Sequence, residues 1–344
     1  MPFGDGSKMV KKAKIEPSPF GSFYSIIRWE KYEEKGEGMS EKLSEYINRY
    51  FIGHEDVTEN VIICLLSGGH VLIEDVPGVG KTTLAKTLAK AVDLSFGRIQ
   101  FTPDTLPSDV LGVQILNMKT GEFEYKEGAV MHQLLLADEI NRTSPKTQAS
   151  LLEAMAEGFV TIDKKRIKLP DPFMVIATQN PIEFVGTYPL PEAQMDRFMM
   201  KLSVGYPTQE NEILMTKNFL AEKNEEAAEA VLNAEKIIEM KKEVEQVKVV
   251  DDVIKYANDI ISMTRSESSF VMGASPRAML HLIRAAQAKA YLSGRDFVKP
   301  DDIKAVAINV LHHRISLTYE AKIAKEDVDK VLKSIILKAK VPMV

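Results

Sequence analysis

VLIEDVPGVGKTTLAKTLAKA, residues Val71–Ala91, is the stretch around which the rest of this chain is organised. Its apolar start, Val71–Ile73, predicts a short buried strand, and the segment after Lys81 carries apolar side chains at helical spacing. A loop containing Gly78 and Gly80 separates the two segments. A strand, a glycine loop, a lysine with a hydroxyl residue, and a helix together have the layout of a phosphate-binding loop.

The residue types in this loop suit the phosphates of a nucleotide. Glycines let backbone N–H groups approach phosphate oxygens, and the helix N-terminus adds partial positive charge at the same point. Lys81 is expected to reach the β and γ phosphates, and the Thr82 hydroxyl to ligate Mg²⁺. The sequence therefore predicts that ATP is held by the loop residues Pro77, Gly78, Val79, Gly80, Lys81, Thr82 and Thr83.

Position 75 departs from the strict phosphate-loop pattern, which has glycine where this chain has Asp75. Aspartate tolerates turn geometry better than most residues, so the loop is still expected to form. The alternative is an ordinary turn between a strand and a helix that happens to contain Gly-Lys. The flanking strand and helix are both present, which favours the phosphate loop.

Composition is that of an ordinary globular protein. The 344 residues suggest about two domains, and 45% hydrophobic with 27% charged residues is typical of soluble proteins. The net charge of -5 gives no bulk attraction to nucleic acid. Cys64 is the only cysteine, which excludes an internal disulfide and favours a cytoplasmic location. No apolar run is long enough to span a bilayer, and no signal-peptide pattern opens the chain.

Composition also divides the chain into three regions. Residues 1–38 mix Gly, Pro, Lys and Glu without a sustained period, so we expect this extension to be partly disordered. The folded part is expected to begin at Met39, a candidate initiator, with Ser40 as the N-cap of the first helix. Residues 39–204 form the predicted core, and residues 205–344 read as helical throughout.

Strands alternate with helices through the predicted core, which indicates a parallel sheet covered by helices. The candidate strands are the short apolar runs at residues 71–73, 98–102, 134–137, 173–178 and 199–204. Two further segments, residues 113–129 and 159–170, each contain two alternating runs joined by turn residues, and they predict β-hairpins.

A second set of candidate site residues follows the predicted strands. Asp138 and Glu139 come directly after the apolar run LLLA. A strand-end aspartate can hold Mg²⁺ beside the loop threonine, and the adjacent glutamate can act as general base on the attacking water. Asn180, at the end of a later strand, is a candidate for orienting that water, although for Asn180 alone a turn role before Pro181 is the more common one.

Two arginines are candidates to stabilise charge on the departing phosphate. Arg197 lies in EAQMDRF and Arg277 in GASPRA. Phosphoryl transfer needs positive charge on the γ phosphate as it leaves, and a guanidinium supplies it with a rigid fork. For either arginine taken alone, a surface or salt-bridge role is the more common one.

Five ordered motifs now resemble a known family. VPGVGKT, LLLADEINR, ATQNP, PLPEAQMDRF and GASPRA, in this order, are similar to the AAA+ ATPases and specifically to the MoxR group. The resemblance covers nearly all of the chain after residue 38. It implies an α/β fold, with a P-loop AAA+ core whose five-stranded parallel sheet is flanked by helices and carries two β-hairpin inserts, followed by an all-helical lid domain. The hairpins at 113–129 and 159–170 resemble the helix-2 and pre-sensor-1 inserts.

The resemblance also implies a role for each candidate residue. The implied roles are Walker A for Lys81 and Thr82, Walker B for Asp138 and Glu139, sensor 1 for Asn180, arginine finger for Arg197, sensor 2 for Arg277, and an interface role for Arg142. Ile52 and His54 are expected near the adenine, where the family usually has Gln in place of His54. Thr82 and Asp138 are the expected Mg²⁺ ligands.

The family forms rings, usually hexamers, with ATP bound between subunits, so Arg197 is expected to act on the neighbour's nucleotide. The resemblance implies that ATP hydrolysis drives remodelling, activation or cofactor insertion in client proteins, and that von Willebrand factor A domain proteins are candidate partners. Two alternatives stay open. The basic turn at Lys164–Lys168 is the only feature that suggests a ring-forming nucleic-acid motor. A non-hydrolysing, nucleotide-gated scaffold is disfavoured by the presence of Glu139 and Arg197.

Overall fold

The computed structural model describes residues 36–163, 165–181, 186–220 and 229–342. Contacts join residues 35–344 into one compact unit. Residues 1–35, which make up most of the extension predicted to be partly disordered, lie outside the described residues. The role of Met39 as the initiator stays a prediction.

The described residues form helices and strands in an alternating order. The α-helices are α1 (Gly36–Tyr50), α2 (Glu55–Leu66), α3 (Lys81–Ala91), α4 (Pro107–Leu111), α5 (Pro145–Glu157), α6 (Glu192–Met195), α7 (Gln209–Leu220), α8 (Ala234–Glu245), α9 (Asp251–Ser266), α10 (Pro276–Leu292), α11 (Pro300–Leu311), α12 (Tyr319–Ile323) and α13 (Val328–Lys338). The strands are β1 (Val71–Glu74), β2 (Phe96–Gln100), β3 (Gly112–Leu116), β4 (Phe123–Glu127), β5 (Leu134–Asp138), β6 (Phe159–Ile162), β7 (Lys165–Lys168), β8 (Met174–Gln179), β9 (Met200–Leu202), β10 (Phe270–Met272) and β11 (Ser316–Leu317).

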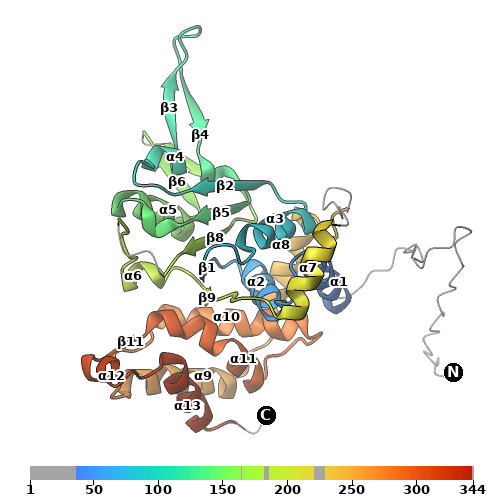
Figure 1. Cartoon of the computed structure of the whole chain (residues 1–344), viewed down its shortest axis with the longest axis vertical. Coiled ribbons are helices and arrows are strands. Elements are labelled where there is room, and N and C mark those ends of the chain that lie inside the picture. Colours follow the sequence, from blue (N-terminus) through green and yellow to red (C-terminus); the bar gives the residue numbers. More distant parts are fainter. Residues whose placement is uncertain (1–35, 164, 182–185, 221–228, 343–344) are drawn as a thin grey trace, which may run out of the picture. The chain divides into compact units, whose positions relative to one another are not determined.

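Five parallel strands form the central sheet, in the order β2-β5-β8-β1-β9 (Figure 1). Because parallel strands share a direction, their carboxyl ends meet at one edge of the sheet. The register pairs Gln100 with Asp138 and Glu74 with Gln179 at that edge. The predicted five-stranded sheet is confirmed, and its carboxyl edge gathers the polar residues that end the strands.

Successive side chains of each strand enter two different hydrophobic clusters, because they point to opposite faces of the sheet. Leu134 and Leu136 of β5 pack with residues of α1, α2 and α3. Leu135 and Ala137 of the same strand pack with residues of α5 on the other face. Helices therefore cover both faces, as an apolar run buried on both sides requires.

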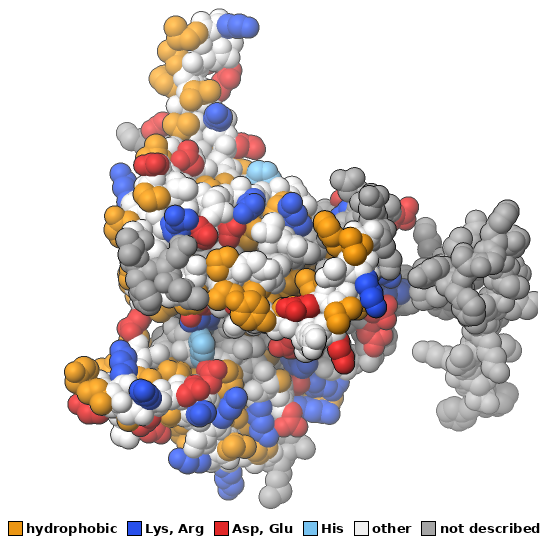
Figure 2. All heavy atoms as spheres, in the orientation of Figure 1, with side chains coloured by type: hydrophobic (Ala, Val, Ile, Leu, Met, Phe, Trp, Pro, Cys, Tyr) orange, Lys and Arg blue, Asp and Glu red, His pale blue; other side chains and the backbone are white. Residues whose placement is uncertain are grey.

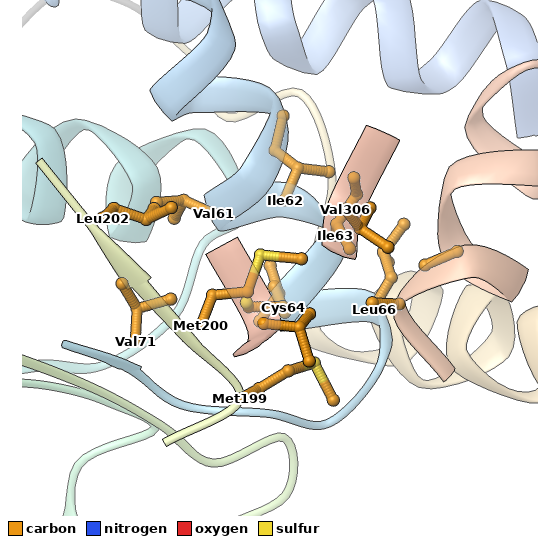
Figure 3. Packing of buried hydrophobic residues seen from close by; sticks show 14 of the residues in the cluster. Val61, Ile62, Ile63, Cys64, Leu66, Val71, Met199, Met200, Leu202 and Val306 are labelled. Atoms are coloured by element: carbon orange, nitrogen blue, oxygen red, sulfur yellow. The ribbon is translucent and has the colours of Figure 1, made fainter. Parts of the chain in front are cut away.

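The C-terminal helices continue the first of these clusters. Val306 of α11 lies near Cys64 of α2 and Met200 of β9 (Figure 3). The region is not wholly helical as predicted, because β10 and β11 form a short antiparallel ladder. Each of these strands is so short that no alternating pattern marked it in the sequence.

Both predicted hairpins are present. β3 pairs with β4, and β6 pairs with β7, each antiparallel. The β3–β4 hairpin projects from the body of the molecule (Figure 1) and carries exposed apolar side chains (Figure 2). Met118 is 87% exposed and Phe123 is 67% exposed, so these side chains contribute little to the core.

One local prediction is wrong. α1 begins at Gly36, so Ser40 lies inside the helix and is buried rather than capping it. Residues 36–39 contain two glycines, which disfavour a helix, but no proline, so the backbone can still extend the helix one turn ahead of Ser40. The division between residues 204 and 205 falls in the connection between β9 and α7, and as a domain boundary it stays a prediction.

Candidate functional site

The loop between β1 and α3 has the backbone geometry that a phosphate cradle needs. Gly78 and Gly80 have φ angles of 89° and 88°, in the left-handed region that side chains disfavour. Gly80 is the residue before α3, and no acidic residue lies in the first turn of that helix. Free N–H groups and the helix dipole therefore meet at a point where no carboxylate on the helix repels an anion. The loop residues fit a nucleotide's phosphates.

Asp75 does more than tolerate the turn. Its carboxylate is buried and accepts hydrogen bonds from Val76 N at 2.8 Å, Ser203 Oγ at 2.9 Å, Val204 N at 2.7 Å and Gly205 N at 2.6 Å. Burial raises the pKa of this carboxyl, but the hydrogen bonds outweigh burial and the net shift is downward. Asp75 thereby ties the phosphate loop to the segment that follows β9.

Lys81 lies between the loop and the acidic strand ends. Its Nζ donates to the backbone carbonyl of Asp75 at 2.7 Å. Burial lowers the pKa of Lys81, and the charges of Asp75, Asp138 and Glu139 oppose that shift. The structure therefore brings the predicted Walker A lysine and Walker B carboxylates into one electrostatic cluster.

Asp138 is held by two residues from neighbouring strands. Thr178 Oγ1 donates to its Oδ1 at 2.6 Å, and Arg98 Nη2 donates to its Oδ2 at 2.7 Å. The Thr178 hydroxyl also accepts from the backbone N–H of Glu139 at 2.9 Å. Sequence reasoning missed both partners. Arg98 and Thr178 lie within two residues of the carboxyl ends of β2 and β8, but Arg98 is the first residue of the predicted strand 98–102, so its place near this edge was not predicted.

Glu139 is oriented from two sides. It has a φ angle of 57°, which turns the chain sharply after β5. Gln100 Nε2 donates to its Oε2 at 2.7 Å, and Arg142 Nη1 lies 2.9 Å from the same oxygen. Gln100 is the last residue of β2 and so lies at the same sheet edge. Arg142, expected at a subunit interface, also holds the predicted general base.

Asn180 follows β8 directly and is buried, and its backbone carbonyl accepts from Asn141 Nδ2 at 3.4 Å. It therefore lies at the same sheet edge as Asp138 and Glu139. Its part in orienting water stays a prediction.

Thr82 is the second residue of α3, directly after the phosphate loop, and Asp138 is the last residue of β5. No group of three or more His, Cys, Asp or Glu side chains suited to a metal occurs in the described part of the chain. Thr82 and Asp138 offer a hydroxyl and a carboxylate, and Mg²⁺ in proteins usually takes one or two carboxylates together with substrate phosphates and waters. The donor set therefore fits a cation held largely by the nucleotide itself.

The Ile52–His54 loop lies beside the phosphate loop. The Phe51 ring would be 3.2 Å from a Cβ at Gly80, and it lies 5.1 Å from the His54 ring, centroid to centroid. A Cβ at Gly53 would overlap the Asn211 side chain, so α7 covers this loop closely. The predicted adenine-side residues Ile52 and His54 are thus next to the phosphate loop, but their contact with a base stays a prediction.

Arg197 and Arg277 lie elsewhere. Both line a cavity of about 500 Å³ whose wall includes Gly68, Gly69 and His70. These three residues precede β1, whereas the phosphate loop follows it, and a strand of four residues spans roughly 13 Å. The two arginines therefore lie together at the opposite edge of the sheet from their own phosphate loop.

Known proteins resemble this chain over most of its length. Sequence models of the ATPase family associated with various cellular activities (AAA) and of an AAA lid domain match residues 70–200 and 262–335. A Bacillus subtilis (strain 168) protein, "Uncharacterized protein YeaC", is 48% identical over 314 residues, or 91% of this chain and 98% of that protein.

A relative and a solved structure have informative names. Chaperone MoxR1 of Mycobacterium tuberculosis (strain ATCC 25618 / H37Rv) is 41% identical over 286 residues, or 80% of this chain and 75% of that protein. A crystal structure from Cytophaga hutchinsonii ATCC 33406, of a protein named as a presumed ATPase, has a TM-score of 0.84 and 38% identity. That match covers 89% of this chain and 96% of the other.

Proposed function

Because this chain belongs to the MoxR family of AAA+ ATPases, we propose that it hydrolyses ATP with Mg²⁺ and that hydrolysis drives the remodelling, activation or cofactor insertion of client proteins. The observation that carries the proposal is the split of the candidate site. The phosphate loop and the Walker B carboxylates lie at one edge of the sheet, and Arg197 with Arg277 at the other. A head-to-tail contact between copies joins two such edges, and repeating it closes a ring.

Each part of the site has a task in this reaction. The loop N–H groups and Lys81 bind the phosphates, and Thr82 and Asp138 hold Mg²⁺, which would neutralise the phosphate charge. Glu139, oriented by Gln100 and Arg142, removes a proton from the attacking water. Asn180 orients that water.

The neighbouring subunit supplies the remaining charge. Arg197 and Arg277 stabilise the departing γ phosphate of the next subunit's nucleotide, since their own loop is out of reach. The sequence left open which nucleotide Arg277 serves, and its location beside Arg197 favours the neighbour's. We propose a hexameric ring in the cytoplasm, with a von Willebrand factor A domain protein as a candidate partner.

The test is the ATPase rate as a function of protein concentration, with mass photometry of the same samples. We expect specific activity to rise as rings form. The Arg197→Ala variant should still assemble into rings, but its ATPase rate should be lower by roughly 10³–10⁵-fold. Activity that is independent of concentration, together with a normal Arg197→Ala rate, would mean that one chain holds the complete site and that the shared-site proposal is wrong.

A scaffold that binds ATP without hydrolysing it predicts a different result. On that reading the basal rate is negligible and Glu139→Gln leaves it unchanged. If the protein hydrolyses ATP as we propose, Glu139→Gln removes the general base and lowers kcat by about 10²–10⁴-fold, while nucleotide binding persists. Equilibrium binding of a fluorescent ATP analogue provides the control, because it separates lost chemistry from lost affinity.

The nucleic-acid motor is the weaker alternative. The basic turn that suggests this motor includes Lys164, which lies outside the described residues. Arg166 stacks on the Phe159 ring, with its Cζ 3.5 Å from the ring centroid. A groove for a polyelectrolyte usually takes a broader basic surface. ATPase stimulation by DNA that falls steeply with salt would favour the motor, and no stimulation at low salt would exclude it.

A further inference from the structure

The segment that carries Arg197 is fastened to the C-terminal helices by one buried side chain. Arg314 follows α11, and its side chain is 1% exposed. Its Nε donates to Asp196 Oδ1 at 2.6 Å. Its two Nη groups donate to the backbone carbonyls of Asp196 at 3.2 Å, Phe198 at 2.5 Å and Met199 at 3.1 Å. These contacts lie on both sides of Arg197, so they fix the backbone on either side of it.

The guanidinium has two further contacts, and because its five N–H groups then meet six acceptors, one N–H of Nη2 is shared between two of them. Arg314 donates to the Val310 carbonyl and, at 2.6 Å, shares a hydrogen bond with His281 Nδ1. Burial, and then the charge of Arg314, lower the pKa of His281 to about 3, so its ring is neutral and Nδ1 accepts. A guanidinium has five N–H donors in a rigid fork, and a lysine cannot replace that geometry.

Asp196 gathers the second arginine into the same cluster. Its carboxylate accepts from Ser275 Oγ at 3.1 Å and lies 3.9 Å from Arg277 Nη1. Ser275 is the N-cap of α10, whose first turn carries Arg277. The carboxylate of Asp196, the residue next to Arg197, therefore contacts both Arg314 and the start of α10.

We propose that Arg314 is a positioning residue, which holds Arg197 and Arg277 in one rigid unit and so presents both to the nucleotide of the neighbouring subunit. This inference rests on the proposed function, because it requires a site shared between subunits. Its specific content is that Arg314 acts in the subunit that donates the arginines, not in the subunit that binds the nucleotide.

The chain offers a matched control in the same helical region. Arg295 also forms a two-pronged contact with a carboxylate, Asp302, at 2.7 and 2.5 Å, and it donates to the Phe297 carbonyl at 3.0 Å. Among the residues that the structure describes, its hydrogen bonds and ring contact reach Phe297 and Asp302 and do not involve residues 196–199. Arg295→Lys therefore weakens a similar clamp without touching the segment around Arg197.

The experiment mixes two inactive subunits in one ring. Lys81→Ala subunits lack a working phosphate loop but carry intact arginines, and Arg197→Ala subunits have the converse defect. Where the two kinds alternate, an Arg197→Ala loop meets intact arginines, so mixing should restore ATPase activity. We then replace the first partner by Lys81→Ala/Arg314→Lys or by Lys81→Ala/Arg295→Lys.

We expect the Arg314 partner to restore about ten- to hundredfold less kcat than Lys81→Ala alone, with KM for ATP unchanged, because a displacement of about 1 Å is enough for such a loss. The Arg295 partner should restore full activity. Full restoration by the Arg314 partner would overturn the inference. If Lys81→Ala and Arg197→Ala themselves fail to complement in mixed rings, the shared-site proposal is wrong as well.

The buried guanidinium makes more hydrogen bonds than a lysine can, so Arg314→Lys can also impair folding or assembly. If Lys81→Ala/Arg314→Lys does not assemble, Lys81→Ala/Ser275→Ala replaces it, because this change removes the Ser275 hydrogen bond to Asp196 and leaves the ion pair between Arg314 and Asp196 in place. Complementation by this variant at the level of Lys81→Ala would overturn the inference. A graded loss, with normal ring mass and thermal stability, would support it.

Discussion

At the residue scale, Asp75 predicts a pH-dependent contribution to stability. The hydrogen bonds to its carboxylate hold the folded pKa below the ordinary value of 3.8. The contribution is therefore complete at pH values above 3.8 and is lost as the pH falls through the folded pKa. We expect Asp75→Asn to lower the free energy of unfolding by about 1–3 kcal/mol at pH 7. In urea unfolding the deficit should be equal at pH 7 and pH 5 and should shrink below pH 3.8.

Asp109→Asn serves as a control for that experiment. Asp109 also accepts a backbone hydrogen bond, from Leu106 N at 2.8 Å, but at an exposed site and without connecting distant segments. Its substitution should cost less and leave amide exchange at Val204 and Gly205 unchanged, whereas Asp75→Asn should accelerate it. A deficit for Asp75→Asn that persists unchanged below pH 3.8 would show that the carboxylate charge is not responsible.

The site residues that could be predicted from the sequence are those marked by a local pattern. Lys81, Asp138 and Glu139 are marked by their spacing from a neighbouring apolar run, which is local information. Asp75 and Arg314 act through partners far along the chain, since Asp75 binds Gly205 and Arg314 binds Asp196. No pattern in the sequence marks such pairs. From sequence alone, Asp75 is therefore only a departure from the phosphate-loop pattern, and nothing distinguishes Arg314 from other arginines.

At the element scale, the β3–β4 hairpin should be nearly independent of the core. Leu116 and Phe123 face each other across the hairpin and are 47% and 67% exposed. The double substitution Leu116→Ser/Phe123→Ser should change the global free energy of unfolding by less than about 1 kcal/mol. Chemical denaturation followed by far-ultraviolet circular dichroism measures this change.

The base of the same hairpin provides the comparison. Tyr125 is half-buried, and its hydroxyl donates to the Leu111 carbonyl at 2.5 Å. Tyr125→Phe leaves that carbonyl without this donor and should cost about 1 kcal/mol, as much as or more than the double substitution at the exposed pair. A large loss from the exposed pair would mean that a surface covers it in solution.

The elements that sequence predicted are those with a local signal. Alternating residues around a glycine turn indicated the β3–β4 hairpin, and apolar runs indicated the central strands. The β10–β11 ladder was missed, because its strands are three and two residues long and lie on either side of α10 and α11. The early start of α1 was missed because Ser40 favours a cap position and Gly36 and Gly38 disfavour a helix, and the structure overrides both local preferences.

At the scale of the whole molecule, one hydrophobic cluster runs from the sheet into the C-terminal helices. Leu136 of β5 and Ile303 of α11 both belong to it and are fully buried. Leu136→Ala and Ile303→Ala should each cost roughly 2–5 kcal/mol, and both should lower the same single thermal transition. Leu337→Ala, at a side chain that is 85% exposed, should leave that transition within about 0.5 kcal/mol. Scanning calorimetry of the nucleotide-free protein measures all three.

Two separate transitions, with Ile303→Ala shifting only one of them, would contradict this prediction. Two transitions would mean that the C-terminal helices have a separate hydrophobic core and can rotate as a unit relative to the sheet when the γ phosphate is lost. A single transition favours a different cycle, because the shared cluster and the Arg314 contacts then keep each subunit rigid. Nucleotide turnover would in that case change the contact between subunits, where the phosphate loop of one meets Arg197 and Arg277 of the next.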